Sequence, residues 1–181
     1  MPLWPIAFPA DLGTGAISLR PYRSDDAPAM FQALDDIRAW EHIPRAIPRD
    51  AAELDRVIRS GTADGNRTTF SIRRGALIVG TTSVIHDPGD PAGAEIGATQ
   101  ISPAEWGTGL NDAVKALLID RIFAAGAAWI QLRTDERNGR SAAAIRKLGV
   151  RELGVHPDTR IRRDGTTRRS LLFRIPRPDG G

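Results

Sequence analysis

The 181-residue sequence contains no cysteine, which excludes disulfides, thiolate metal sites and a cysteine nucleophile. Its three histidines, His42, His86 and His156, are too scattered to show metal-ligand spacing, so we expect no metal site. Tyrosine occurs once, and the only lysines are Lys115 and Lys147, although the formal net charge is +3. Arginine therefore carries the positive charge, and its planar fork suits a polyphosphate ligand or an RNA-rich partner.

Long apolar runs are also missing. No uncharged stretch is long enough to cross a membrane as a helix, and the proline-rich N-terminal segment has no cationic leader. We therefore expect a cytoplasmic protein without a membrane partner. At 19.6 kDa the chain has the size of a single domain.

The order of patterns predicts an α+β fold with one mixed, mostly antiparallel central sheet flanked by helices. Alternating apolar residues predict strands at 17–20, 68–73, 76–85, 94–101, 129–133 and 150–155, and a hairpin over 160–175 around Asp164-Gly165. Apolar stripes and caps predict helices from Ser24, from Asp50, at 109–125 and at 141–148. We expect an irregular arm at 1–16, one domain at 17–176 and a tail at 177–181.

One glycine-rich turn, Gly107-Thr108-Gly109, lies between a predicted strand and a predicted helix. Glycines let backbone N–H groups approach an anion, and a helix N-terminus adds unpaired donors, so a phosphate can bind there. A tight connection before a packed helix is the alternative, because 18 glycines give such triplets by chance. The spacing fits neither a Walker loop nor a dinucleotide fingerprint.

Three blocks of sequence carry a family resemblance: residues 17–26, residues 106–115 and residues 132–149. Their order and spacing resemble the GNAT superfamily of acyl-CoA N-acyltransferases. Within it, the chain is similar to the bacterial branch of ribosomal-protein alanine and serine N-acetyltransferases. The resemblance covers about residues 17 to 175 and implies a single GNAT-like domain that uses acetyl-CoA as acyl donor.

The resemblance also implies a set of cofactor-binding residues. The backbone from Trp106 to Leu110 would surround the pyrophosphate, and the end of the preceding strand and the later helix would bind the pantetheine arm. The residues concerned are Thr99, Ile101, Trp106, Gly107, Thr108, Gly109, Leu110, Asn138, Ser141 and Lys147. Two of these have a structural alternative, since Asn138 suits a helix cap and Ser141 a solvent-facing first turn.

The implied chemistry is direct transfer from the thioester to an amine. Many members of the superfamily protonate the leaving thiolate with a tyrosine, but Tyr22 lies outside the matching motif. By resemblance, Ser141 takes that role. Glu95, on the strand leading to the turn, is the best-placed base or ammonium-binding carboxylate, and Glu105 and His86 are weaker candidates. An exposed edge-strand position for Glu95 is equally compatible with the pattern.

The segments expected to determine which amine is bound carry weaker sequence patterns. Residues 37–49, with Trp40 and His42, and the terminal hairpin are expected to bind it. Arginines crowd that hairpin and could attract acidic peptide, a CoA phosphate or rRNA, or could form a solvated face; they are Arg160, Arg162, Arg163, Arg168 and Arg169. One departure from the family pattern is Ala104, where many members carry Gln or Arg.

The leading hypothesis is an acetyl-CoA-dependent N-acetyltransferase acting on a primary amine, either a protein N-terminus, such as that of a ribosomal protein, or a small amino compound. A non-catalytic acyl-CoA sensor is the alternative. A basic RNA-associated protein is a third class, but no aromatic-rich strand supports direct nucleic-acid binding. The sequence leaves open the short acyl group and whether the chain forms a homodimer.

Overall fold

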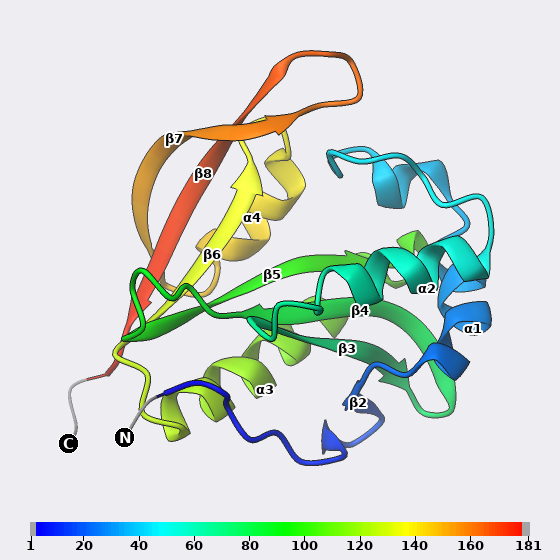
Figure 1. Ribbon diagram of the computed structural model, residues 1–181. Coiled ribbons are helices and arrows are strands. Elements are labelled where there is room, and N and C mark those ends of the chain that lie inside the picture. The colour runs from blue at the N-terminus through cyan, green and yellow to red at the C-terminus, as the bar shows by residue number, and fades with distance from the viewer. Residues whose placement is uncertain (1–2, 179–181) are drawn as a thin grey trace.

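The computed structural model describes residues 3–178, in which eight strands form one sheet in the order β1-β2-β3-β4-β5-β6-β8-β7 (Figure 1). The strands are β1 (Leu12–Thr14), β2 (Ile17–Pro21), β3 (Arg67–Arg74), β4 (Leu77–Ile85), β5 (Gly93–Ile101), β6 (Trp129–Asp135), β7 (Arg151–Ile161) and β8 (Thr167–Pro176). In this sheet β5 and β6 are parallel, and the other neighbouring strands are antiparallel. The predicted α+β fold with a mixed, mostly antiparallel sheet is confirmed. The ends of the predicted arm and tail, residues 1–2 and 179–181, lie outside the described residues.

Helices cover both faces of the sheet. They are α1 (Ala27–Ala33), α2 (Ala51–Ser60), α3 (Leu110–Ala124) and α4 (Gly139–Arg146), with short 3-10 helices η1 (Ser24–Asp26), η2 (Ile37–Trp40) and η3 (Pro103–Glu105). Figure 1 shows α3 beneath the sheet and α2 above it, while α4 lies beside β6. Within residues 3–178, no helix is long and apolar enough to span a membrane.

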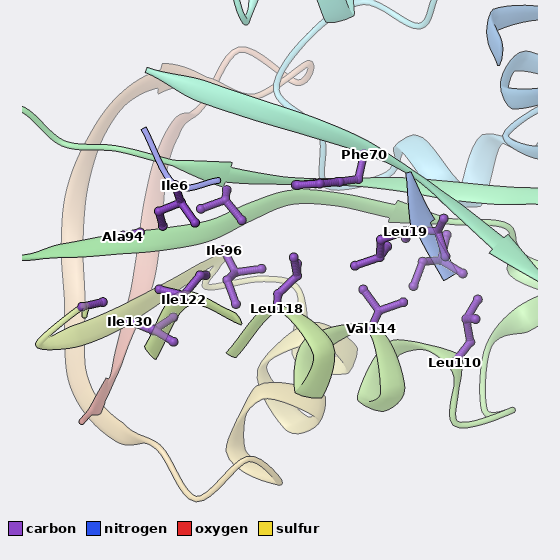
Figure 2. Packing of buried hydrophobic residues seen from close by; sticks show 14 of the residues in the cluster. Ile6, Leu19, Phe70, Ala94, Ile96, Leu110, Val114, Leu118, Ile122 and Ile130 are labelled. Carbon is purple, nitrogen blue, oxygen red and sulfur yellow. The ribbon is translucent and has the colours of Figure 1, made fainter. Parts of the chain in front are cut away.

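The main core lies between α3 and the sheet (Figure 2). Side chains of the helix at i, i+4, i+8 and i+12 are fully buried: Leu110, Val114, Leu118 and Ile122. They pack with Leu19, Phe70, Ile96 and Ile130, none more than 1% exposed. Each such burial stabilises by about 1.5–3 kcal/mol. This core therefore fixes the N-terminus of α3, and the glycine turn before it, against the end of β5.

Local capping explains where α2 and α4 begin. The Asp50 carboxylate accepts the Glu53 backbone N–H at 2.7 Å, as the capping spacing predicts, and the Glu53 carboxylate accepts the Arg49 N–H at 2.8 Å. Helix α4 begins at Gly139, two residues before the predicted start, because the Asn138 side chain caps it.

Two strands differ from expectation. The arm predicted to be irregular contains β1, whose three residues pair with β2. Strand β7 continues to Ile161 rather than ending at Val155, because β8 supplies backbone partners along it. Most β7 side chains are exposed, so the strand lacks the apolar alternation by which a half-buried strand is predicted.

The β7–β8 hairpin turns at Asp164-Gly165 as predicted. Gly165 has φ +82°, which favours glycine, and the Asp164 carboxylate accepts the Thr166 N–H at 2.9 Å. Figure 1 shows the tip reaching toward the segment after η2. Arg163 near this tip donates to the Glu41 carbonyl at 3.5 Å. The tip of the hairpin and the segment after η2 are thus in contact.

Candidate active site

The sheet opens between its two parallel strands. Strands β5 and β6 pair only where Gly93–Ile96 faces Trp129–Leu132, and Figure 1 shows them diverging beyond that point. The register of β5 against β4 shifts in the same region, and Ala98 has φ +49°, which is rare for a non-glycine residue. A bulge therefore ends the parallel pairing and leaves a gap that penetrates the sheet.

A cavity of about 770 Å³ occupies this opening and reaches both sides of it. One end is lined by the glycine turn, α3 and α4, through Trp106, Gly107, Gly109, Lys115, Asn138, Ser141 and Lys147. The other end is lined by the η2 segment, β3 and the hairpin, through Trp40, His42, Arg45, Arg67, Arg160 and Arg168. Glu95 and Thr99 lie along β5, which borders both ends. The cavity thus brings together most of the residues that the sequence singled out.

The glycine turn is built to present backbone N–H groups. Gly107 and Gly109 have φ of +77° and +82°, and a Cβ at either would meet nothing within 4 Å, so backbone conformation rather than crowding requires glycine. Gly109 is the N-cap of the 15-residue α3 and has no side chain to cap it. The Leu110 N–H donates to the Thr108 hydroxyl at 3.4 Å. Among residues 3–178, the Asn111 and Asp112 N–H groups make no hydrogen bond and are available to an anion.

Neighbouring side chains brace the turn. The Arg74 guanidinium binds the Glu105 carboxylate at 2.7 Å, and the Thr108 hydroxyl donates to the Glu105 carbonyl at 2.9 Å. The Trp106 indole donates to the Ile101 carbonyl at 3.1 Å, and the guanidinium of Arg140 lies 3.4 Å from the centre of its ring. Leu110, the last residue expected at the pyrophosphate, is fully buried beneath the turn.

Asn138 and Ser141 lie across the cavity from the turn. The Asn138 carbonyl oxygen caps α4 by accepting the Ser141 N–H at 3.0 Å. In the part of the chain that the structure describes, the Asn138 amide nitrogen and the Ser141 hydroxyl make no hydrogen bond. Capping therefore uses one atom of Asn138 and leaves its donor side free, so the two interpretations of this residue are compatible. Lys147 ends α4 and is exposed at the cavity rim.

We name the end lined by the η2 segment, β3 and the hairpin the acceptor end, after the expectation from the sequence, and the end at the glycine turn the donor end. Two groups that can accept a proton border the acceptor end. The Glu95 carboxylate is largely buried and is held by Arg133 at 2.8 Å and by Gln131 at 3.1 Å. Burial lowers the pKa of the His42 imidazole below 6.5, against the opposing effect of Glu41. His42 is therefore mainly neutral at pH 7 and can act as a base.

Three other candidates from the sequence are engaged by structural partners. Glu105 lies at the glycine turn, where hydrogen bonds from Arg74 lower its pKa, so it is a bracing residue and not a base. His86 stacks on Trp4 with ring centres 5.3 Å apart and lines a neighbouring cavity of about 320 Å³. That cavity shares Arg67, Ile85, Glu95 and Arg133 with the main one. Trp40 borders the main cavity but is 3% exposed, and its indole donates to the Leu34 carbonyl at 2.8 Å. Trp40 therefore holds the η2 loop in place, and little of its ring is exposed for contact with a ligand.

Sequence reasoning missed Lys115. Its side chain is 5% exposed, borders the cavity and donates to the Thr99 hydroxyl at 2.7 Å, which in turn bonds Thr82 at 2.8 Å. Burial lowers the pKa of Lys115 from 10.5 to about 8. The spacing of residues in the sequence could have indicated its burial. Lys115 lies three residues before Leu118 and seven before Ile122, both buried, so it is on the apolar face of α3.

Comparison with known proteins decides the family. Residues 17–151 match the family model of the acetyltransferase (GNAT) domain. The chain belongs to the GNAT acetyltransferases. The donor of this acetyltransferase is accordingly acetyl-CoA. The comparison with curated proteins finds no match.

Solved structures share the fold of this GNAT acetyltransferase. One is RimJ of Mycobacterium smegmatis in complex with CoA-disulfide, with a TM-score of 0.75, 24% identity and coverage of 88% of this chain and 81% of that one. Another, from Salmonella typhimurium, is an acetyl transferase that modifies the N-terminal serine of ribosomal protein L7/L12 (0.77, 15%, 90% and 96%). A third is the Microcin C7 self-immunity acetyltransferase MccE with acetyl-CoA and AMP (0.78, 17%, 90% and 93%). The first two neighbours are consistent with the resemblance to ribosomal-protein acetyltransferases.

Proposed function

We propose that this GNAT protein transfers the acetyl group of acetyl-CoA directly to a primary amine. The observation that carries the proposal is the single cavity through the β5/β6 opening, which joins the glycine turn to the acceptor end. Acetyl-CoA supplies the activated acetyl group as a thioester. Because one cavity serves both ends, donor and acceptor can be held together without a covalent enzyme intermediate.

The donor side is assigned by chemistry. The N–H groups of the Gly107–Leu110 turn suit the pyrophosphate, since a helix N-terminus attracts anions. The β5 edge near Thr99 and Ile101, left unpaired by the bulge, suits the pantetheine amides. The free amide nitrogen of Asn138 suits a pantetheine carbonyl, and Lys147 at the rim suits a phosphate.

The acceptor side supplies the base. Glu95 or His42 takes the proton that the amine loses as it forms the new amide bond, and Glu95 can also hold the incoming ammonium. A backbone N–H at the β5 bulge suits the developing oxyanion. Trp40 positions the η2 loop that carries His42.

The leaving thiolate needs a proton, and two groups border the donor end. Ser141 has an uncommitted hydroxyl. Burial lowers the pKa of Lys115 to about 8, which makes its ammonium group a stronger acid than an ordinary lysine and a better proton donor to a thiolate. Tyr22 is excluded from this role because it lies outside the cavity lining and donates to Asp55 at 2.9 Å.

Ser141→Ala tests the proton donor. We expect acetyl-CoA affinity within about twofold of wild type and turnover lowered by about tenfold or more, because the hydroxyl acts only as the thiolate forms. Binding is measured by calorimetry and turnover by thiol release. Ser60→Ala, at the exposed end of α2, is the matched control. Normal turnover in Ser141→Ala would transfer the donor role to Lys115.

The activity itself is tested by thiol release with a panel of amines. The panel contains peptides with free N-termini, among them N-terminal peptides of ribosomal proteins, together with amino acids, polyamines and aminoglycosides. We expect at least one class to release thiol well above the rate of hydrolysis, with an acetylated product of the expected mass. Saturable acetyl-CoA binding with no acetylation of any amine would instead identify an acyl-CoA sensor.

A further inference from the structure

Two arginines at the acceptor end of the cavity have no acidic partner. Among residues 3–178, the guanidinium groups of Arg45 and Arg67 have no carboxylate within 4.0 Å and make no hydrogen bond, and the Arg67 Nε is buried. The charge of Arg67 contributes to lowering the pKa of Asp64, but the two side chains are too far apart to form an ion pair. The acceptor end therefore contains positive charge that the protein leaves unpaired.

The other arginines that line this cavity are paired or stacked. Arg140 also has no carboxylate within 4.0 Å among residues 3–178, but its guanidinium lies 3.4 Å from the centre of the Trp106 ring. Arg133 binds Glu95 at 2.8 Å, and Arg160 binds Asp158. Arg168 is buried and lies 3.6 Å from the Asp158 carboxylate. Arg45 and Arg67 thus differ from these neighbours in having neither an acidic partner nor an aromatic ring against the guanidinium.

Strand register places Arg67 in line with the candidate base. Arg67 is opposite Ile85 in β3 and β4, and Ile85 is opposite Glu95 in β4 and β5. Residues directly opposite each other point to the same face of a sheet, and neighbouring strands are about 4.8 Å apart. Arg67 and Glu95 therefore share a face, with about 10 Å between their backbones. Both residues line the main cavity.

Arg45 approaches the same region from the loop between η2 and α2. Partial burial lowers its pKa, and the charges of Arg67 and Arg160 lower it further. Guanidinium groups stay protonated in proteins, so these neighbours repel one another until an anion joins them. A carboxylate or phosphate would relieve that repulsion and fill the hydrogen bonds that Arg45 and Arg67 leave unmade.

We propose that the acceptor carries an anionic group, a carboxylate or a phosphate a few bonds from its amine, and that Arg45 and Arg67 bind it. The inference rests on the proposed acetyl transfer and narrows its substrate class. The amine faces Glu95 and His42 while the anion lies against the two arginines. Neutral amines and polyamines are then poor acceptors, because they carry no anionic group that can pair with the guanidinium groups of Arg45 and Arg67.

Binding to the CoA complex tests the proposal without requiring turnover. Three pairs of probes differ only in the anion: O-phosphoethanolamine against ethanolamine, β-alanine against β-alaninamide, and the amidated peptide Ala-Glu-Ala-Ala against Ala-Gln-Ala-Ala. We expect the anionic member of at least one pair to bind about tenfold more tightly. The pair that responds identifies a phosphate, a small carboxylate or an acidic peptide as the source. The preference should weaken at high salt.

Variants link the preference to the two arginines. In Arg45→Gln and Arg67→Gln we expect the anion preference to fall at least fivefold, and in Arg67→Lys to persist in part because the charge remains. Arg56→Gln, on the exposed side of α2, should keep the wild-type preference, and thermal unfolding confirms that each variant is folded.

Two results would overturn the inference: no anionic probe binding more tightly than its neutral partner, or a preference unchanged in the double variant Arg45→Gln/Arg67→Gln. Acetyl transfer is measured separately with the same probes. Charge-dependent binding together with no transfer to these probes or to any amine of the panel would reject the proposed function and leave this anion site standing.

Discussion

Gly107→Glu is expected to lower the affinity for acetyl-CoA by about 100-fold or more, which corresponds to about 2.7 kcal/mol. The new carboxylate would lie beside the N–H groups that suit the pyrophosphate, where it both repels that anion and competes for its donors. Nothing lies within 4 Å of the added Cβ, so crowding does not contribute, but φ of +77° strains any side chain there and must be controlled for. Calorimetric titration measures the affinity.

The control for this variant is Gly15→Glu. Gly15 lies in the turn between β1 and β2 with φ +57° and open space around its Cβ, so it adds the same charge under similar backbone strain far from the cavity. We expect wild-type affinity there. Equal losses in both variants would mean that strain, and not the pyrophosphate site, causes the effect.

Lys115→Met is expected to stabilise the unliganded protein. Below pH 8 the lysine is charged in both the folded and the unfolded state, and the folded state carries the cost of burying that charge. Because one pKa unit corresponds to about 1.4 kcal/mol, lowering the pKa from 10.5 to about 8 costs about 3 kcal/mol. Methionine has a similar length and no charge, so it removes this cost. It also forfeits the hydrogen bond to Thr99, worth about 1 kcal/mol.

The stabilisation by Lys115→Met should depend on pH. Between pH 8 and 10.5 the unfolded state holds the Lys115 proton and the folded state does not, so the wild-type free energy of unfolding rises with pH through this residue. The advantage of Lys115→Met should therefore be full at pH 7 and shrink as pH rises toward 10. Urea unfolding of both proteins at several pH values measures it. A constant difference would contradict the lowered pKa.

The same substitution separates stability from function. If Lys115 contributes to thiolate protonation, turnover falls by about tenfold or more while the protein becomes more stable. Lys115→Arg is the companion variant, because it keeps the charge but has a far higher pKa. Full turnover in the methionine variant would restrict Lys115 to a structural role at Thr99.

Much of the fold was predictable because its signals are local. The buried face of α3, the Asp50 cap and the Asp164-Gly165 turn follow from the residues themselves. Strand β7 was predicted too short because its side chains are mostly exposed and its length depends on pairing with β8. The early start of α4 likewise depends on one side-chain bond from Asn138.

The candidate site divides in the same way. Gly107, Gly109, Asn138 and Ser141 were found by motif, and the structure places them around one cavity. The unpaired state of Arg67 could not be predicted, because it depends on which carboxylates the fold brings near. The surroundings of His86 and Glu105 also required the fold. His86 stacks on Trp4 outside the lining of the main cavity, and the Glu105 carboxylate is engaged by Arg74.

The central claim is that the opening between β5 and β6 is an acetyl-CoA site. Titration of the purified chain with acetyl-CoA in a calorimeter tests it most directly. We predict saturable binding of one acetyl-CoA per chain, which prior saturation with CoA abolishes and Gly107→Glu prevents. No heat of binding up to high micromolar acetyl-CoA, or binding that Gly107→Glu leaves intact, would contradict the account.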